Sequence, residues 1–176
     1  MRTGFIAGFV AAVLAGLGAF YFIASAGLIP ANADAKPPAL ENWIARKALN
    51  AAIVRQMSKG ENPVALNDQN LIAGIKLYAV DCAICHGAAD GKASDVAKGL
   101  YQRAPQLASH GVEDDEDGEN YWKVYHGIRM TGMPAYHGSL TEDEIWKVVL
   151  FLKNMNALSG APQKAWLAVP SQARKS

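Results

Sequence analysis

The sequence has little cysteine and almost no net charge. It holds 2 cysteines among 176 residues, which excludes a disulfide-rich secreted scaffold and a zinc site of four cysteines within one chain. Lys and Arg number 17 and Asp and Glu number 16, so the net charge of +1 gives no reason to expect a nucleic acid as a partner. Hydrophobic residues make up 51% of the chain, a share that excludes a disordered tail. We therefore expect a folded domain with an additional segment.

Charge is absent from one long stretch near the N-terminus. Residues 4–29 carry no charged side chain, and Arg2 is the only charge before Asp34. Because hydrocarbon requires every backbone polar group to be paired, we predict a helix long enough to cross a bilayer core of about 30 Å. An Ala-Asn-Ala sequence at 31–33 leaves a cleaved signal peptide as the alternative, although signal peptides have shorter apolar regions. We favour an uncleaved membrane anchor over residues 1–33.

A linker and a second helix are predicted over residues 34–66. The linker contains a Pro-Pro pair, and residues 41–58 then follow a helical pattern. Apolar residues recur there at steps of three and four: Trp43, Ile44, Ala48, Leu49, Ala52, Ile53 and Met57. We expect this amphipathic helix to pack on the following domain. A position on the membrane surface or against a partner subunit is the alternative.

Cys82, Cys85 and His86 form the most informative motif. They stand in Cys-Ala-Ile-Cys-His, the attachment pattern of a c-type haem. Two thiols one helical turn apart can each add to a vinyl group of the haem, and the histidine then places its imidazole beneath the iron. A thioredoxin-like pair would require a βαβ context, and a zinc site would require a further ligand at finger-like spacing. The sequence shows neither pattern, so we predict one covalent haem c with His86 as an axial iron ligand.

A methionine loop downstream supplies the second axial ligand in this interpretation. Met130 and Met133 lie in Arg-Met-Thr-Gly-Met-Pro-Ala-Tyr, where Gly132 and Pro134 indicate a fixed loop rather than a helix or strand. A thioether ligand raises the reduction potential because it stabilises ferrous iron. A lone methionine is usually core filler. Beside a haem motif, however, we predict that Met133, rather than Met130, binds the iron.

Two helices are predicted on either side of these motifs. The first begins at Asn67 or Asp68. Its apolar face consists of Leu71, Ile72, Ile75, Tyr78, Ala79 and Cys82. The last begins with a capping box at Thr141 and Glu144, and Gly160 and Pro162 end it. Its apolar face consists of Ile145, Val148, Val149, Leu152 and Met155.

Together these features resemble the class I c-type cytochrome family, and especially small bacterial cytochromes with one N-terminal anchor. The resemblance rests on Gly74-x-x-Leu77-Tyr78, Cys82-x-x-Cys85-His86-Gly87, Gly132-Met133-Pro134-Ala135 and the last helix. It covers roughly residues 69–160 and implies an all-α cytochrome c fold around one covalently bound haem. This fold would be preceded by a transmembrane helix and an amphipathic helix. The implied organisation is an anchor over 1–33, a linker and helix over 34–66, a cytochrome c domain over 67–160 and a tail over 161–176.

The resemblance also implies particular contacts. In the family, the helix before the haem crosses the last helix closely. Gly74 and Tyr78 would there face Val148 and Phe151. A proline carbonyl of the family accepts the free N–H of the haem histidine. Pro105 stands at a suitable place to accept this bond from His86 and so to orient the imidazole.

An iron with both axial positions filled has no open site for a substrate. We therefore expect an electron carrier rather than an enzyme, with one redox protein as donor and another as acceptor. Its haem domain would face the periplasm from the cytoplasmic membrane. One alternative is a haem-based sensor or peroxidase-like enzyme with a displaceable distal ligand, for which His126 or His137 would offer a distal group. Another is an electron-transfer subunit of a larger membrane oxidoreductase, docked through the helix at 41–58.

An acidic run occupies residues 113–119, where only Gly118 is not an acid. Its spacing partly matches a calcium loop, but Val124 stands where that loop requires glutamate. We expect a solvated loop, with a docking patch for a basic redox partner as the alternative.

Overall fold

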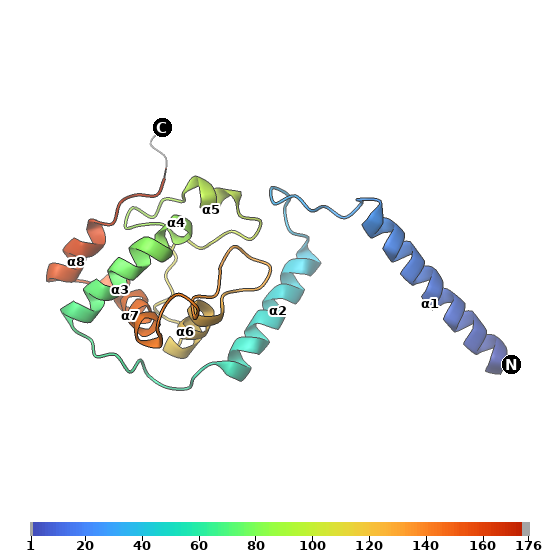
Figure 1. Ribbon diagram of the computed structural model, residues 1–176, viewed down its shortest axis with the longest axis horizontal. Coiled ribbons are helices and arrows are strands. Elements are labelled where there is room, and N and C mark those ends of the chain that lie inside the picture. Colours follow the sequence, from blue (N-terminus) through green and yellow to red (C-terminus); the bar gives the residue numbers. More distant parts are fainter. Residues whose placement is uncertain (1, 174–176) are drawn as a thin grey trace. The chain divides into compact units, whose positions relative to one another are not determined.

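The computed structural model describes residues 2–173, and every regular element in that range is a helix (Figure 1). This confirms the all-α prediction. The elements are α1 (Arg2–Ser25), α2 (Ala39–Gln56), α3 (Asp68–Asp81), α4 (Ala83–His86), α5 (Asp95–Gly99), α6 (Asp117–His126), α7 (Glu142–Asn154), the 3₁₀ turn η1 (Met155–Ala157) and α8 (Gly160–Leu167). The chain divides into two compact units, Met1–Ala35 and Lys36–Ser176.

The first unit is built on the apolar helix α1. Its stretch Thr3–Ser25 has a mean hydropathy of 2.2 and, by length and composition alone, could cross a membrane. The helix ends earlier than the predicted residue 29 because Gly27 adopts a left-handed conformation, with φ of +69°. The N–H of Leu28 then donates to the carbonyl of Ile23 at 3.1 Å. This is the Schellman pattern, which satisfies carbonyl groups at a helix end.

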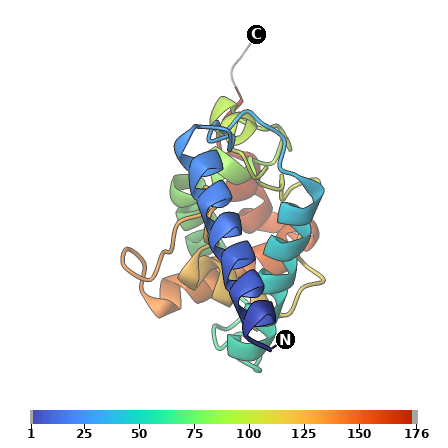
Figure 2. The ribbon, with the colours of Figure 1, turned by 90° about the vertical axis from the view of Figure 1, so that its right-hand side faces the viewer.

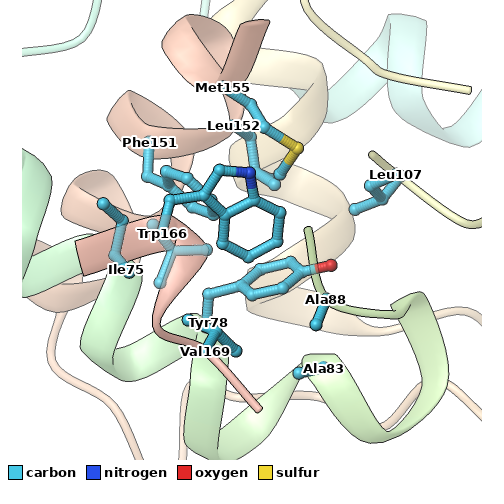
Figure 3. Close-up of a cluster of buried hydrophobic side chains, with 11 residues drawn as sticks. Ile75, Tyr78, Ala83, Ala88, Leu107, Phe151, Leu152, Met155, Trp166 and Val169 are labelled. Atoms are coloured by element: carbon cyan, nitrogen blue, oxygen red, sulfur yellow. The ribbon is translucent and has the colours of Figure 1, made fainter. Parts of the chain in front are cut away.

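The core of the second unit lies where α3 crosses α7. A Cβ atom on Gly74 would lie 2.1 Å from the carbonyl oxygen of Lys147, so only glycine lets the two backbones approach this closely. The ring of Tyr78 meets that of Phe151 edge-on, with centroids 5.2 Å apart. Figure 3 shows these side chains within the apolar cluster that joins α3, α7 and α8. The close crossing implied by the sequence is therefore present.

Both framing helices begin at the predicted caps. The side chain of Asn67 accepts from the N–H of Asn70 at 2.9 Å. Thr141 and Glu144 form the capping box, in which each side chain accepts from the other residue's N–H. Such caps satisfy N–H groups that have no partner within the helix.

Helix α8 occupies residues that the sequence assigned to a tail. Gly160 and Pro162 do end the preceding helix, but they also lie in the first turn of α8, where proline is tolerated because its missing N–H would be unpaired. Trp166 on α8 is only 6% exposed and packs edge-on against Tyr78 and Phe151, with centroid distances of 5.5 and 5.0 Å. The packed domain therefore extends past residue 160. Residues 174–176 of the predicted tail lie outside the described residues.

Helix α2 packs along one side of the second unit (Figures 1 and 2). Ile53 is its buried anchor, with 2% exposed surface. Two hydrogen bonds fasten its ends: Tyr101 Oη donates to Glu41 Oε2 at 2.9 Å, and Trp122 Nε1 donates to Gln56 Oε1 at 3.2 Å. The interpretation as a helix packed on the domain is thus confirmed for this face. The expectation that Trp43 and Ile44 share it is wrong, because both are exposed.

Candidate haem site

All five predicted site residues line one cavity of about 300 Å³. Cys82, Cys85 and His86 reach it from the segment around α4, Pro105 from the following loop, and Met133 from the loop after α6. Most of the remaining wall is apolar: Leu49, Tyr78, Leu100, Ala104, Leu107, Val112, Val124, Ile128, Pro134, Tyr136, Val148 and Leu152. The fold thus brings the predicted site residues, which extend from Cys82 to Met133 in the sequence, to the wall of one cavity.

The single turn of α4 is held from several sides. A helix end leaves carbonyl groups without intrahelical partners, and here side chains from other segments donate to them. These bonds are Tyr136 Oη to Asp81 O at 2.6 Å, Ser94 Oγ to Ile84 O at 2.5 Å, Gln106 Nε2 to Cys85 O at 2.9 Å and Tyr78 Oη to Gly87 O at 2.9 Å. The attachment motif is therefore fixed by the fold rather than by its own short helix.

The imidazole of His86 is oriented by Pro105. Nδ1 of His86 lies 2.9 Å from the carbonyl oxygen of Pro105. A carbonyl can only accept, so Nδ1 carries the proton and Nε2 keeps its lone pair. Burial lowers the pKa of His86, and the bond to Pro105 acts in the opposite direction. The imidazole is therefore neutral at pH 7 and able to bind a metal through Nε2.

Gln106 fastens the loop that carries this carbonyl, and the sequence did not single it out. Besides its bond to Cys85, its Nε2 donates to the carbonyl of Ala104 at 3.2 Å. The N–H of Leu107 donates to the carbonyl of His86 at 3.1 Å. No local pattern marks Gln106, because its main partner is a backbone group 21 positions away in the chain.

Both thiols are protonated at neutral pH in the folded chain. Burial, followed by the nearby Asp81 and Cys85, raises the pKa of Cys82 to about 12. Burial also raises the pKa of Cys85. A redox dithiol works through a thiolate with a lowered pKa, so this environment does not suit thioredoxin-like chemistry.

The two methionines of the methionine loop lie in different surroundings. Met133 lines the cavity, whereas Met130 has a φ of +60° and is 89% exposed. The N–H of Met133 donates to Thr131 Oγ1 at 3.1 Å, and its carbonyl accepts from the N–H of Ile128 at 3.1 Å. These bonds fix the backbone of Met133 at the cavity wall.

His126 and His137 lie on the surface, outside the cavity wall. The ring of His137 stacks on Tyr125 with centroids 5.2 Å apart, and His126 lies 5.0 Å from Trp122. Both histidine side chains therefore pack against aromatic rings at the surface. Neither therefore provides a distal group facing the cavity.

The cavity wall also includes groups that the sequence did not predict. Leu49 reaches it from α2, and Gln102, Arg103, Asn120 and Lys123 add polar groups. An amphipathic porphyrin with acidic substituents suits this cavity. The site offers it two thiols, a neutral imidazole and a thioether, within apolar walls that have cations nearby. The residues present therefore fit a haem c.

The acidic run is bound into the domain more than a solvated loop would be. Lys123 Nζ lies 3.0 Å from Asp115 Oδ2 and 2.6 Å from Glu119 Oε1. Asp117 begins α6, and its Oδ2 accepts from the N–H of Asn62 at 3.1 Å. Several of these carboxylates are thus already paired within the chain.

Comparison with known proteins gives the family of this domain. Residues 69–152 match the family described as cytochrome C oxidase, cbb3-type, subunit III. This part of the chain belongs to the class I c-type cytochromes, and the family resemblance seen in the motifs is confirmed.

One solved structure similar to this chain is that of the reducing HAO-like protein complex of Kuenenia stuttgartiensis. The sequence identity is 18% and the TM-score is 0.43. The match covers 59% of this chain and 53% of that chain, so this chain spans about half the length of that protein. No curated protein matches the chain.

Proposed function

We propose that this protein is a membrane-anchored mono-haem cytochrome that carries single electrons between two redox proteins outside the cytoplasmic membrane. One observation carries the proposal. Cys82, Cys85, His86 and Met133 converge on a single apolar cavity, where His86 is held in the tautomer that leaves Nε2 available.

Each of these residues has a distinct part. Cys82 and Cys85 would hold the haem through thioether bonds, and His86 and Met133 would be its axial ligands. The bound haem supplies one-electron Fe(III)/Fe(II) chemistry. The protein orients the imidazole through Pro105 and excludes water with the apolar wall, which together tune the reduction potential. A filled pair of axial positions favours electron transfer over catalysis.

Absorption spectroscopy of Met133→Ala tests this assignment. The ferric wild-type protein should show the weak far-red band of a sulfur–iron bond, and Met133→Ala should abolish it. Met130→Ala is the matched control and should leave the band unchanged, because Met130 faces solvent. A wild-type protein without the band would favour a ligand-binding or peroxidase-like role. A protein without haem after expression with the attachment machinery would refute the proposal.

The apolar helix α1 supports the proposed anchorage. It could equally be a signal sequence, since both are apolar and N-terminal. An anchor predicts that the mature protein retains residues 1–33, remains in membranes after alkaline washing and exposes its haem domain to protease from the periplasmic side. A mature N-terminus at Asp34 in a soluble protein would instead show cleavage.

A fixed place in a larger oxidoreductase is the second candidate. It is favoured by the matched family, whose description names an oxidase subunit. The carrier would purify alone from mild detergent, whereas a subunit would co-purify with catalytic chains in a constant ratio.

A further inference from the structure

Helix α2 carries a second apolar face, opposite the one that packs on the domain. Exposure is 67% for Leu40, 60% for Trp43, 52% for Ile44 and 67% for Val54. With Ala51, these residues follow steps of three and four and therefore share one side of the helix. The side formed by Leu49, Ala52, Ile53 and Met57 is the one turned to the domain.

The outer face has positive charge around it. Lys47 lies within it, and Arg46 and Arg55 are also exposed on α2. The single acid of the helix, Glu41, accepts the hydrogen bond of Tyr101. Apolar residues with an interfacial tryptophan and flanking cations are the pattern of a helix that lies in the plane of a membrane. Each cation near an anionic lipid surface adds about 1 kcal/mol of attraction.

Chain connectivity keeps this face close to a bilayer. Residues 26–38, about 13 in all, join α1 to α2 and span at most ~45 Å when fully extended. Leu40, Trp43 and Ile44 lie in the first turns of α2, next to this tether.

A redox partner suits the outer face less well than lipid does. The inner face of α2 contributes Leu49 to the cavity wall, so the helix itself stands between its outer face and the cavity. A protein docked on that face would be held away from the cavity by a helix diameter of about 10 Å.

We propose that the outer face of α2, formed by Leu40, Trp43, Ile44, Ala51 and Val54, docks on an anionic lipid surface. The inference rests on the proposed anchorage by α1. It adds that the haem domain is held against the bilayer by α2 instead of moving freely on its tether.

Cysteine protection in nanodiscs tests the docking. The proposed haem consumes both native thiols, so one introduced cysteine is the only free thiol of the full-length, haem-loaded protein. The test position is Val54→Cys, and the matched control is Val80→Cys, a valine on α3 that is 79% exposed. Leu14→Cys on α1 reports the anchorage separately. Unchanged absorption spectra will show that each variant is folded.

The readout is the rate of modification by a membrane-impermeant maleimide. In nanodiscs of phosphatidylcholine with phosphatidylglycerol, Val54→Cys should react about tenfold more slowly than Val80→Cys. Adding Leu40→Ser and Ile44→Ser to Val54→Cys should restore most of the rate.

The possible outcomes separate the two proposals. Protection of Leu14→Cys with equal rates for Val54→Cys and Val80→Cys overturns the docking and leaves the anchorage standing. A reactive Leu14→Cys overturns both. Protection of Val54→Cys in native membranes but not in nanodiscs of the pure protein overturns lipid docking in favour of a protein partner.

Discussion

The amide of Gln106 joins the two segments that surround His86. Its Nε2 donates to the carbonyls of Cys85 and Ala104, one on the attachment turn and one on the loop that carries Pro105. Backbone carbonyls that lose their donor in a buried setting destabilise a fold more than the bond itself stabilises it. Gln106 thus joins the turn that carries Cys85 to the loop that carries Pro105 in the candidate haem site.

Replacing Gln106 with methionine should remove these bonds while nearly keeping the side-chain volume. We expect Gln106→Met to lower the free energy of unfolding by about 1–2 kcal/mol, because the Cys85 carbonyl loses its donor. Urea unfolding of the haem-loaded protein measures the change. Gln102→Met, a partly exposed glutamine four positions earlier, is the control and should change stability far less. Equal losses for both variants would contradict the assigned role.

The predictability of individual residues depended on where their partners lie. Cys82, Cys85 and His86 form a motif within five positions, and Met133 has glycine and proline beside it, so the sequence marks them directly. Their roles as haem ligands stay predictions. Gln106 bonds to distant backbone carbonyls, which have no sequence signature. Nothing in the sequence could therefore single it out.

Among the helices, the crossing of α3 and α7 depends on a single missing side chain. Gly74→Ala would place a Cβ atom 2.1 Å from the Lys147 carbonyl oxygen, and backbone cannot yield as a flexible side chain can. We expect a loss of about 3 kcal/mol or more in the free energy of unfolding. Thermal unfolding followed by circular dichroism measures it.

Gly99→Ala provides the control for this substitution. Gly99 also lies in a helix, but a Cβ atom there meets nothing within 4 Å. This variant should be neutral or slightly more stable, because alanine has the higher helix propensity. A Gly74→Ala protein as stable as Gly99→Ala would show that the crossing can relax.

The capping box of α7 makes part of the stability depend on pH. Hydrogen bonds from the N–H and then the hydroxyl of Thr141 lower the pKa of Glu144. The carboxylate therefore stabilises the fold above the ordinary glutamate pKa of about 4.3, and this contribution is lost as the pH falls through the lowered value. Glu144→Gln keeps an acceptor oxygen but does not titrate.

Stability curves at several pH values test this behaviour. Wild type should exceed Glu144→Gln at neutral pH, and the difference should shrink as the solution is acidified. Glu142→Gln removes an acid from the same helical turn and leaves the capping box intact, so it separates capping from the general effect of charge. A difference that stays constant with pH would contradict the linkage.

Helix prediction succeeded where local signals were complete. Capping residues and apolar residues at helical spacing together define α3 and α7, and both helices begin where the sequence indicates. The eight residues of α8 include a glycine and a proline in the first turn, and both are also typical of a helix stop, so the sequence assigned Trp166 to a tail. In α2 the helical spacing of the apolar residues predicted one apolar face, whereas in the structure these residues divide between two faces. That division is decided by packing across space.

At the scale of the whole molecule, α2 extends the candidate haem site beyond the family domain. The matched region begins at residue 69, yet Leu49 belongs to the cavity wall. Bonds from Tyr101 and Trp122 fasten the two ends of the helix to segments near the cavity. An element outside the recognised domain thus forms part of the cavity wall.

Leu49→Ala should open that wall and lower the reduction potential, because greater water access favours the more highly charged ferric state. The half-buried leucine should also contribute about 1–2 kcal/mol to stability, less than a fully buried one. Potentiometric titration of the full-length protein measures the first effect and urea unfolding the second. Leu40→Ala is the matched control on the same helix, where the leucine faces away from the domain and is 67% exposed. A potential that moves equally in both variants would mean that α2 acts through its general packing and not by closing the cavity at Leu49.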